Sequence, residues 1–355
     1  MKHRPLLCAA ALLIAVVILW QALAAHPVRE TLPGTQAAQR RLIRIWVCSS
    51  VGGEESWLRE CLKDWEKENP GAMTFLRTVT PQEIFREDAI LPDVLLYTPG
   101  VITAPQELFV PLTNVSGVRE PLLRAGRWQL QQYGLPLCYG GYAIAIDSVL
   151  EPHLAETPAP TTLLGKPSAT VSPGAAATPG LPAGAVLIAP KGCGLFTLGS
   201  LLTERPPLTE DFATTDATDV FRRFQARQAT SALLTTGQIT ALNGTFPFRA
   251  LAPSEVITDQ VWLASLFPGA NEAAASLLTH LTSAGSQRKL SKQGLHTVRE
   301  DLRLYVSGTE ALMETAAARS LTVISAYIPT ADVEAAAWQF FHGRTGLSEA
   351  LMPLL

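Results

Sequence analysis

The sequence lacks the short motifs of the common hydrolases and nucleotide-binding enzymes. It contains no Gly-x-Ser-x-Gly, no His-Glu-x-x-His and no phosphate-binding loop. Its six histidines are scattered, at positions 3, 26, 153, 280, 296 and 342. We therefore expect a protein that is not an enzyme, with no catalytic residues, no metal ligands and no cofactor.

Cysteine is also scarce, with five in 355 residues and neither Cys-x-x-Cys nor a metal-site spacing. Cys48 falls in an expected strand and Cys61 on the apolar face of an expected helix, so both are interpreted as small core residues. An oxidising location would permit disulfides without requiring them. The sequence leaves the pairing of Cys48, Cys61, Cys138 and Cys193 open.

Charged residues make up only 17% of the chain, and no run rich in lysine and arginine stands out. The 28 basic and 31 acidic residues give a formal net charge of −3. Because a nucleic-acid-binding protein needs a basic face against the phosphates, nucleic acid is not an expected partner.

The first 25 residues read as an export signal. Lys2 and Arg4 precede an apolar run from Leu6 to Trp20, and Ala22-Leu-Ala24 fits signal-peptidase cleavage before Ala25. The alternative is an uncleaved anchor, since positions 6–25 are long enough to span a bilayer. Cys8 lies too early to be a lipoprotein cysteine. Either reading places the protein in the periplasm or on the outer face of the cytoplasmic membrane, with residues 26–41 as a tether.

The next hundred residues alternate strands and helices. Positions 42–48 read as a strand, and the apolar spacing from Trp57 to Trp65 marks one face of a helix that Asn69-Pro-Gly71 stops. Positions 73–79 read as a second strand. Thr80-Pro-Gln-Glu83 combines an N-cap, a proline at the first helical position and a capping-box glutamate. The apolar run 93–97 suits a strand buried on both faces.

The rest of the chain is also predicted to contain both strands and helices. A helix is expected over 118–132, and a strand-like segment over 134–147 is interrupted by Gly140 and Gly141. These glycines indicate either an ordinary bulge or a crossing between two lobes. Positions 157–184 form a Pro-, Ala- and Thr-rich low-complexity loop. Strands are expected at 185–189, 246–252 and 261–266, and helices at 271–282, 311–318, 331–342 and 348–354, with Gly343 ending the helix over 331–342. Positions 214–236 read as one or two helices.

Several motifs share an order that is typical of one family. They are Ser49-Ser-Val-Gly-Gly-Glu54, Pro92-Asp-Val-Leu-Leu-Tyr97, the glycine-broken segment 134–147, the helix and Gln-Gly loop of 271–300, and Tyr327-Ile-Pro329. Together they cover most of residues 42–355, and the chain resembles the extracellular solute-binding proteins of ABC importers. The resemblance implies an α/β, two-lobed periplasmic-binding-protein-like fold with crossing strands between the lobes.

The resemblance also implies how the lobes and partners are arranged. Lobe one would comprise 42–140 plus 262–305, and lobe two 141–261 plus 306–355. A small polar solute, most simply a carbohydrate, would lie between them and pass to the permease subunits of an ABC importer.

The chain also departs from the family in two ways. Thr297 replaces a family proline, and much of the 95-residue span from Glu151 to Thr245 is the low-complexity loop. The sequence therefore predicts a second lobe with fewer helices than the family has. The leading interpretation stays the solute receptor, and this departure motivates an alternative, a degenerate binding-protein scaffold that serves envelope interaction or assembly.

Half of the candidate ligand-binding residues surround the end of the first strand. Ser49, Ser50 and Gly52 precede the first helix, so their hydroxyls and backbone N–H groups could hold a ligand hydroxyl or carboxylate. Serine and glycine also cap helices without any ligand. Glu55 could accept hydrogen bonds from a sugar, although first-turn glutamates commonly serve the helix dipole.

The other candidates are aromatic. Tyr97 stands at the carboxyl end of a buried strand, where ligands of α/β sheets bind. Tyr139 and Tyr142 flank the paired glycines, and strand alternation would place them on opposite faces unless the chain bulges there. Trp262 lies on the return crossing and reads equally as a sugar-stacking platform or as a core residue.

Overall fold

The largest of the four β-sheets in the described residues organises the first part of the fold. The computed structural model describes residues 41–49, 51–86, 90–113, 115–150, 186–189, 191–201 and 216–355. The larger sheet has six strands in the order β13-β6-β12-β3-β1-β2. Their bounds are β1 Arg41–Cys48, β2 Ala72–Thr78, β3 Val94–Tyr97, β6 Leu135–Tyr139, β12 Val261–Leu266 and β13 His296–Thr297.

The sheet is mixed in direction. β1 is parallel to both β2 and β3, as expected for β-α-β units, whereas β12 runs antiparallel to both β3 and β6. β3 has strands on both sides and every one of its residues is buried, which confirms the strand predicted from its apolar run. The late strand β12 thus enters the middle of a sheet that began at β1.

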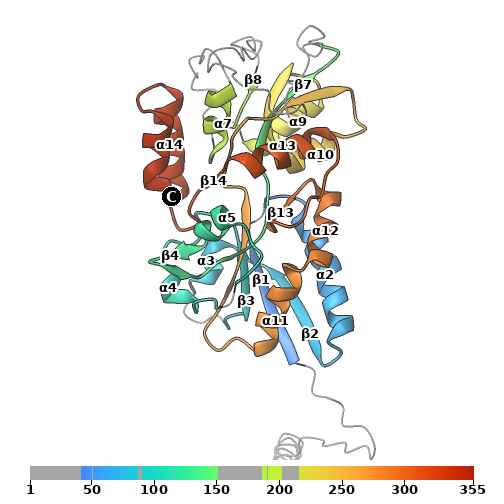
Figure 1. The fold of residues 1–355 in the computed structure, drawn as a ribbon, viewed down its shortest axis with the longest axis vertical. Coiled ribbons are helices and arrows are strands. Elements are labelled where there is room, and N and C mark those ends of the chain that lie inside the picture. The colour runs from blue at the N-terminus through green and yellow to red at the C-terminus, as the bar shows by residue number, and fades with distance from the viewer. Residues whose placement is uncertain are drawn as a thin grey trace, which may run out of the picture. The chain divides into compact units, whose positions relative to one another are not determined.

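Helices cover both faces of this sheet. In Figure 1, α2 (Glu54–Glu68) and α12 (Ala284–Arg288) run along one side, and α3 (Pro81–Ile84), α4 (Pro105–Leu108) and α5 (Glu120–Ala125) lie along the other. The Trp57 indole joins α2 to α12 by donating to the Ser286 carbonyl at 2.8 Å. α11 (Glu272–Leu281) and the 3-10 turn η2 (Lys289–Gln293) complete the α2 side.

The smaller sheet has four strands in the order β10-β7-β9-β8. Alternate residues of β7 enter two different cores: Ala143 and Ala145 face one, whereas Ile144 and Ile146 face the other. Helices α7 and α14 pack together on the isoleucine side (Figure 1). The bounds are β7 Tyr142–Asp147, β8 Val186–Leu187, β9 Ser231–Thr235, β10 Phe248–Leu251, α7 Gly194–Leu201, α9 Ala217–Gln225, α10 Thr236–Leu242, α14 Thr330–Phe341, α15 Leu347–Leu351 and η3 Met352–Leu354.

The chain passes between the two sheets at the paired glycines. β6 belongs to the larger sheet and β7 to the smaller, and only Gly140 and Gly141 separate them. A Cβ on Gly141 would lie 2.5 Å from the methyl carbon of Met313, so close packing accounts for this glycine. A parallel pair, β11 (Val256–Thr258) and β14 (Leu321–Val323), with α13 (Gly308–Arg319) beside it, adjoins this crossing.

The helix predicted over 118–132 is wrong beyond its first two turns. α5 ends at Ala125, and the remainder forms the ribbon of β4 (Arg127–Trp128) and β5 (Gln131–Gln132). The turn between them places Gln129 and Leu130 at φ values of 47° and 69°. Gly126 explains the break, because it permits Gly134 to approach and bond to its carbonyl.

One or two helices were predicted over 214–236, and this prediction is wrong in the second half of the segment. α9 ends at Gln225, and Arg227 takes a φ of 58° that breaks the helical path. Residues 231–235 then form β9 between β7 and β8. A short apolar run such as Ser-Ala-Leu-Leu-Thr fits a strand and a buried helix equally well by periodicity, and the sheet decides between them.

The residues at which helices begin and end were predicted more successfully. The capping box at Thr80 and Glu83 is present, and Gly343 follows α14 with a φ of 68°. Cys48 and Cys61 are buried free thiols, as are Cys138 and Cys193. Neither a three-residue cluster of potential metal ligands nor a helix suited to crossing a bilayer occurs in the described ranges.

Several predictions fall outside the described residues. They concern the export segment 1–25, nearly all of the tether 26–41, Ser50, and the low-complexity loop 157–184. The predicted shortening of the second lobe also depends on positions 151–185 and 202–215, so it stays a prediction.

Candidate functional site

The loop between β1 and α2, residues 49–53, forms an open corner at the carboxyl end of a central strand. Ser49, Gly52 and Gly53 are exposed and all have positive φ, at 69°, 96° and 88°. Gly53 is the N-cap of α2 and supplies no side-chain cap to the helix. The first-turn N–H groups of this helix therefore lie beside an exposed loop, where they favour an oxygen-rich or anionic group.

Trp262 supports this corner from inside the protein. Its indole Nε1 donates to the Ser49 carbonyl at 3.3 Å, and its ring meets that of Trp57 edge to face at 6.4 Å. The Ser49 hydroxyl accepts a bond from Thr98 Oγ1 at 2.9 Å. Because Trp262 is fully buried, its placement matches the core alternative and offers no open ring surface for a sugar.

Tyr97 and Tyr139 are also buried. The hydroxyls of Tyr97 and Ser265 lie 2.9 Å apart, and burial raises the pKa of Tyr97 to about 12. Burial likewise raises the pKa of Tyr139 to about 12, although the nearby positive charge of Arg119 opposes this. The Tyr139 ring lies 5.1 Å from that of His296. Both tyrosines were candidates for ligand contact, with Tyr139 or Tyr142 open to being a core residue, and the described structure encloses Tyr97 and Tyr139.

Tyr142, on the smaller sheet, belongs to a polar cluster. Its hydroxyl donates to Asp259 Oδ1 at 2.7 Å and accepts from Gln260 Nε2 at 2.8 Å. The backbone N–H of Cys193 donates to Asp259 Oδ2 at 3.0 Å. Burial, reinforced by the Asp259 carboxylate, raises the pKa of Tyr142 well above its usual value. A neutral phenol is thus fixed against a carboxylate and an amide that are both partly exposed.

Sequence reasoning missed Asp259 and Gln260. They occupy the two positions between β11 and β12, where the chain returns toward the larger sheet. The Gln260 carbonyl accepts from Gly140 N at 2.7 Å, and Thr258 Oγ1 donates to the Gly140 carbonyl at 2.9 Å. In the sequence, these residues could be recognised as two consecutive polar residues between two short apolar segments. Their position beside the crossing became clear only from the fold.

The start of α10 links this crossing to the corner. Thr236 N donates to the Gly141 carbonyl at 2.9 Å. A Cβ on Gly237 would lie 3.4 Å from the carbonyl oxygen of Gly52, so α10 approaches the loop after β1. The helix that follows β9 of the smaller sheet therefore meets the loop that follows β1 of the larger sheet at the open corner.

Glu55 lies apart from these contacts. Its carboxylate pairs with Arg59 at 2.6 Å on the exposed face of α2, which fits the helix-surface alternative. The preceding residue, Glu54, is buried at the first position of the helix, where its carboxylate is favoured by the helix dipole.

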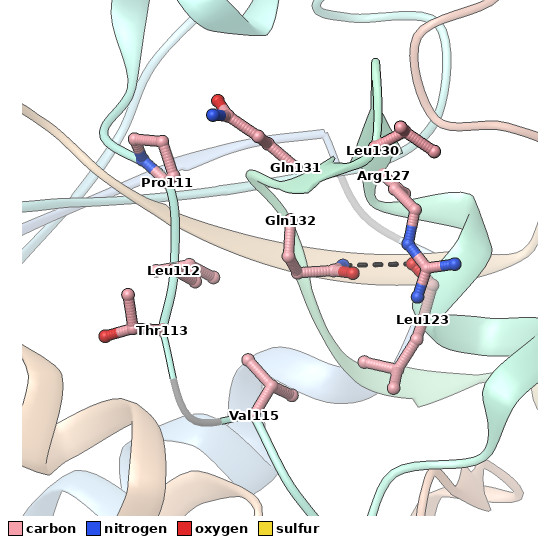
Figure 2. A pocket seen from close by; sticks show the side chains of 9 residues that line it. All are labelled: Pro111, Leu112, Thr113, Val115, Leu123, Arg127, Leu130, Gln131 and Gln132. Atoms are coloured by element: carbon pink, nitrogen blue, oxygen red, sulfur yellow. Dashed lines mark hydrogen bonds between the residues drawn. The ribbon is translucent and has the colours of Figure 1, made fainter.

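A separate hollow of about 480 Å³ lies beside the β4–β5 ribbon. Figure 2 shows its lining side chains, including Gln132, whose amide donates to the Leu123 carbonyl at 3.0 Å. None of the predicted site residues lines it. The lining residues are Pro111, Leu112, Thr113, Val115, Leu123, Arg127, Leu130, Gln131 and Gln132.

Comparisons with known proteins identify the fold. No protein-family model matches this sequence, and no curated protein sequence is detectably similar to it. Solved structures do match. The GacH receptor of Streptomyces glaucescens, studied with acarbose, superposes with a TM-score of 0.57 at 14% identity, over 87% of this chain and 95% of that one.

Two further structures agree with this result. The ABC substrate-binding protein Lmo0181 of Listeria monocytogenes, in complex with cycloalternan, gives a TM-score of 0.55 at 12% identity, over 88% of this chain and 97% of its own. A cyclo/maltodextrin-binding protein with maltotetraose gives 0.56 at 12% identity, over 87% and 94%. The chain therefore has the two-lobed α/β fold of the ABC substrate-binding proteins, which confirms the predicted fold class.

Proposed function

We propose that this protein is an extracytoplasmic solute receptor that binds a carbohydrate and presents it to the permease subunits of an ABC importer, without catalysis. One observation carries the proposal: the chain spans 94–97% of three solved receptors or binding proteins that were studied with acarbose, cycloalternan or maltotetraose. The two sheets would be the two lobes, with boundaries near the predicted 42–140 plus 262–305 and 141–261 plus 306–355.

The ligand would lie at the meeting point of the corner and the polar cluster. The exposed N-terminal turn of α2 offers N–H donors, and the partly exposed Asp259 and Gln260 offer an acceptor and a donor. Such a mixture suits sugar hydroxyls, which both donate and accept hydrogen bonds. Ser49 and Gly52 would contribute from the corner, and Tyr142 would position Asp259.

Thermal unfolding of the full chain against a panel of oligosaccharides, amino acids and polyamines tests this proposal. A ligand at 100 times its Kd stabilises the native state by about 2.7 kcal/mol, and a sugar in the panel should raise Tm accordingly. The variant Asp259→Asn should weaken that sugar roughly tenfold or more through loss of a charged acceptor. Asp332→Asn, at an exposed position of α14, is the matched control. Absence of any shift across the panel would count against a receptor.

The enclosure of three predicted aromatic residues favours a second candidate, a scaffold that retains the fold for envelope interaction or assembly. Tyr97, Tyr139 and Trp262 are all buried, so they offer no stacking platform. Affinity capture from membranes distinguishes the two functions. Recovery of a permease supports the receptor, and recovery of a different envelope protein without a permease supports the scaffold.

A further inference from the structure

At the end of the larger sheet where β1 begins, the helices leave a small part of one face exposed, and this part carries three apolar side chains and one arginine. Leu42 on β1 pairs in register with Met73 on β2, and Arg44 pairs with Phe75. Because neighbours in register share a face, these four side chains project together. The side chains of Leu42, Met73 and Phe75 are 43%, 45% and 54% exposed, and Arg44 is exposed as well. We call these four residues the β2 face.

The β2 face lies at the edge of the sheet. β2 is the last strand in the order of the larger sheet, as Figure 1 also shows. Exposed apolar residues on an edge strand are normally avoided because they invite association. Farther along the same face, the guanidinium carbon of Arg77 lies 5.6 Å from the centre of the buried Trp46 ring. The arginine therefore covers the apolar surface at that end of β1 and β2. The exposed apolar surface is thus confined to the end where β1 begins.

We propose that the β2 face docks on an anionic lipid bilayer. The proposal rests on the proposed extracytoplasmic receptor and on the reading of positions 6–25 as an uncleaved membrane anchor. β1 begins at Arg41, immediately after the 40 residues that include the apolar run Leu6–Trp20. A chain held by that run would keep the start of β1, and so the β2 face, within reach of the membrane. Apolar side chains beside Arg44 on the same face match the boundary between anionic headgroups and acyl chains, and Arg41, whose side chain alternates to the other face of β1, adds positive charge at the same end of the strand.

The edge itself argues against a second copy as the occupant. Both the N–H and the hydroxyl of Thr74 donate to Glu66 Oε1, at 2.7 and 2.6 Å. This carboxylate occupies a ladder position on the free edge of β2, where an added strand would have to bond. The exposed face, rather than the edge, is left for a partner.

Hydrogen–deuterium exchange of the full chain in vesicles tests the docking. Vesicles of phosphatidylglycerol and phosphatidylcholine should slow exchange over residues 72–78 at least fivefold relative to phosphatidylcholine alone. The double variant Met73→Ser, Phe75→Ser and the single variant Arg44→Glu should each abolish the difference. Met352→Ser, which removes an exposed methionine elsewhere, should retain it.

Two outcomes would overturn the proposal. One is equal exchange in the two vesicle types. The other is protection that disappears when each vesicle carries a single protein molecule, which would assign the face to a second copy. The sugar-induced Tm shift of the double variant is measured in parallel. A preserved shift without lipid protection defeats only the docking, whereas lipid protection without any sugar response defeats only the receptor.

Discussion

Asp147 ends β7 with a carboxylate that is almost completely buried. Arg227 donates to its two oxygens at 2.7 and 3.2 Å, and the N–H groups of Val149 and Leu150 donate as well. Burial raises the pKa of this carboxyl, but these hydrogen bonds outweigh burial and leave its pKa below the usual value. The last residue of a strand is thus tied to the loop that follows α9.

Removal of Arg227 should therefore destabilise the protein. Arg227→Ala leaves a buried charge with fewer partners, so we expect a loss of about 2–4 kcal/mol of unfolding free energy, measured by urea denaturation. Arg223→Ala breaks only an exposed pair with Asp219 at 3.9 Å and should cost less than about 0.5 kcal/mol. Equal losses in the two variants would contradict this explanation.

His296 makes stability depend on pH. It is buried between the rings of Tyr139 and Tyr305, and burial, with a smaller contribution from Arg119, lowers its pKa to about 3. The unfolded chain binds the proton near pH 6.5 and the native state does not. The free energy of unfolding therefore has its full value above about pH 6.5. It decreases progressively as the pH falls toward 3, because protonation favours the unfolded chain.

Because of this histidine, we expect the free energy of unfolding to fall by about 2 kcal/mol when the pH is lowered from 7.5 to 5. His296→Phe should flatten the pH dependence of unfolding in that range, whereas His342→Asn, at an exposed position, should preserve it. Urea denaturation at each pH measures the slope. An unchanged slope in His296→Phe would show that another group controls it.

At the scale of elements, Gly126 decides where α5 ends and the β4–β5 ribbon begins. A Cβ at this position would lie 1.9 Å from the carbonyl oxygen of Gly134, which is backbone and unable to rotate away. Gly134 N and Tyr133 N both donate to the Gly126 carbonyl at 3.0 Å. The two segments are therefore held face to face by their backbones.

Gly126→Ala should cost about 2–4 kcal/mol, because the backbones must separate and strain the surrounding contacts. Gly71→Ala is a matched control, since a Cβ there meets no atom within 4 Å. Chemical denaturation of both variants gives the comparison. A tolerated Gly126→Ala would mean that the ribbon moves freely relative to α5.

Elements with a distinctive signal could be predicted, and elements without one could not. The helix after β1 has its apolar residues at helical spacing, and Thr80 with Glu83 carries a complete capping signature. The apolar segment 231–235 is too short to show a period, and it becomes strand β9 because β7 and β8 offer their edges.

At the scale of the whole molecule, a ligand at the crossing would touch both sheets. The corner follows β1 in the larger sheet, and Tyr142 begins β7 in the smaller. A bound sugar should therefore slow hydrogen exchange both at residues 51–56 and at residues 139–142. Protection confined to one of these segments would indicate a ligand that binds one lobe only.

The sequence by itself determined the elements with a clear period or end signal and the likeness to solute-binding proteins, because periodicity and capping depend on residues close in the chain. It did not determine β4, β5 or β9. Tertiary structure decided which side chains face outward at the candidate site. Tyr97 and Trp262 stand on adjacent strands that other strands and helices enclose, so both became core residues. The position of Asp259 and Gln260 beside the crossing depends on the pairing of β12 with β6 in the larger sheet. These segments are far apart in the sequence, so only tertiary packing brings them together.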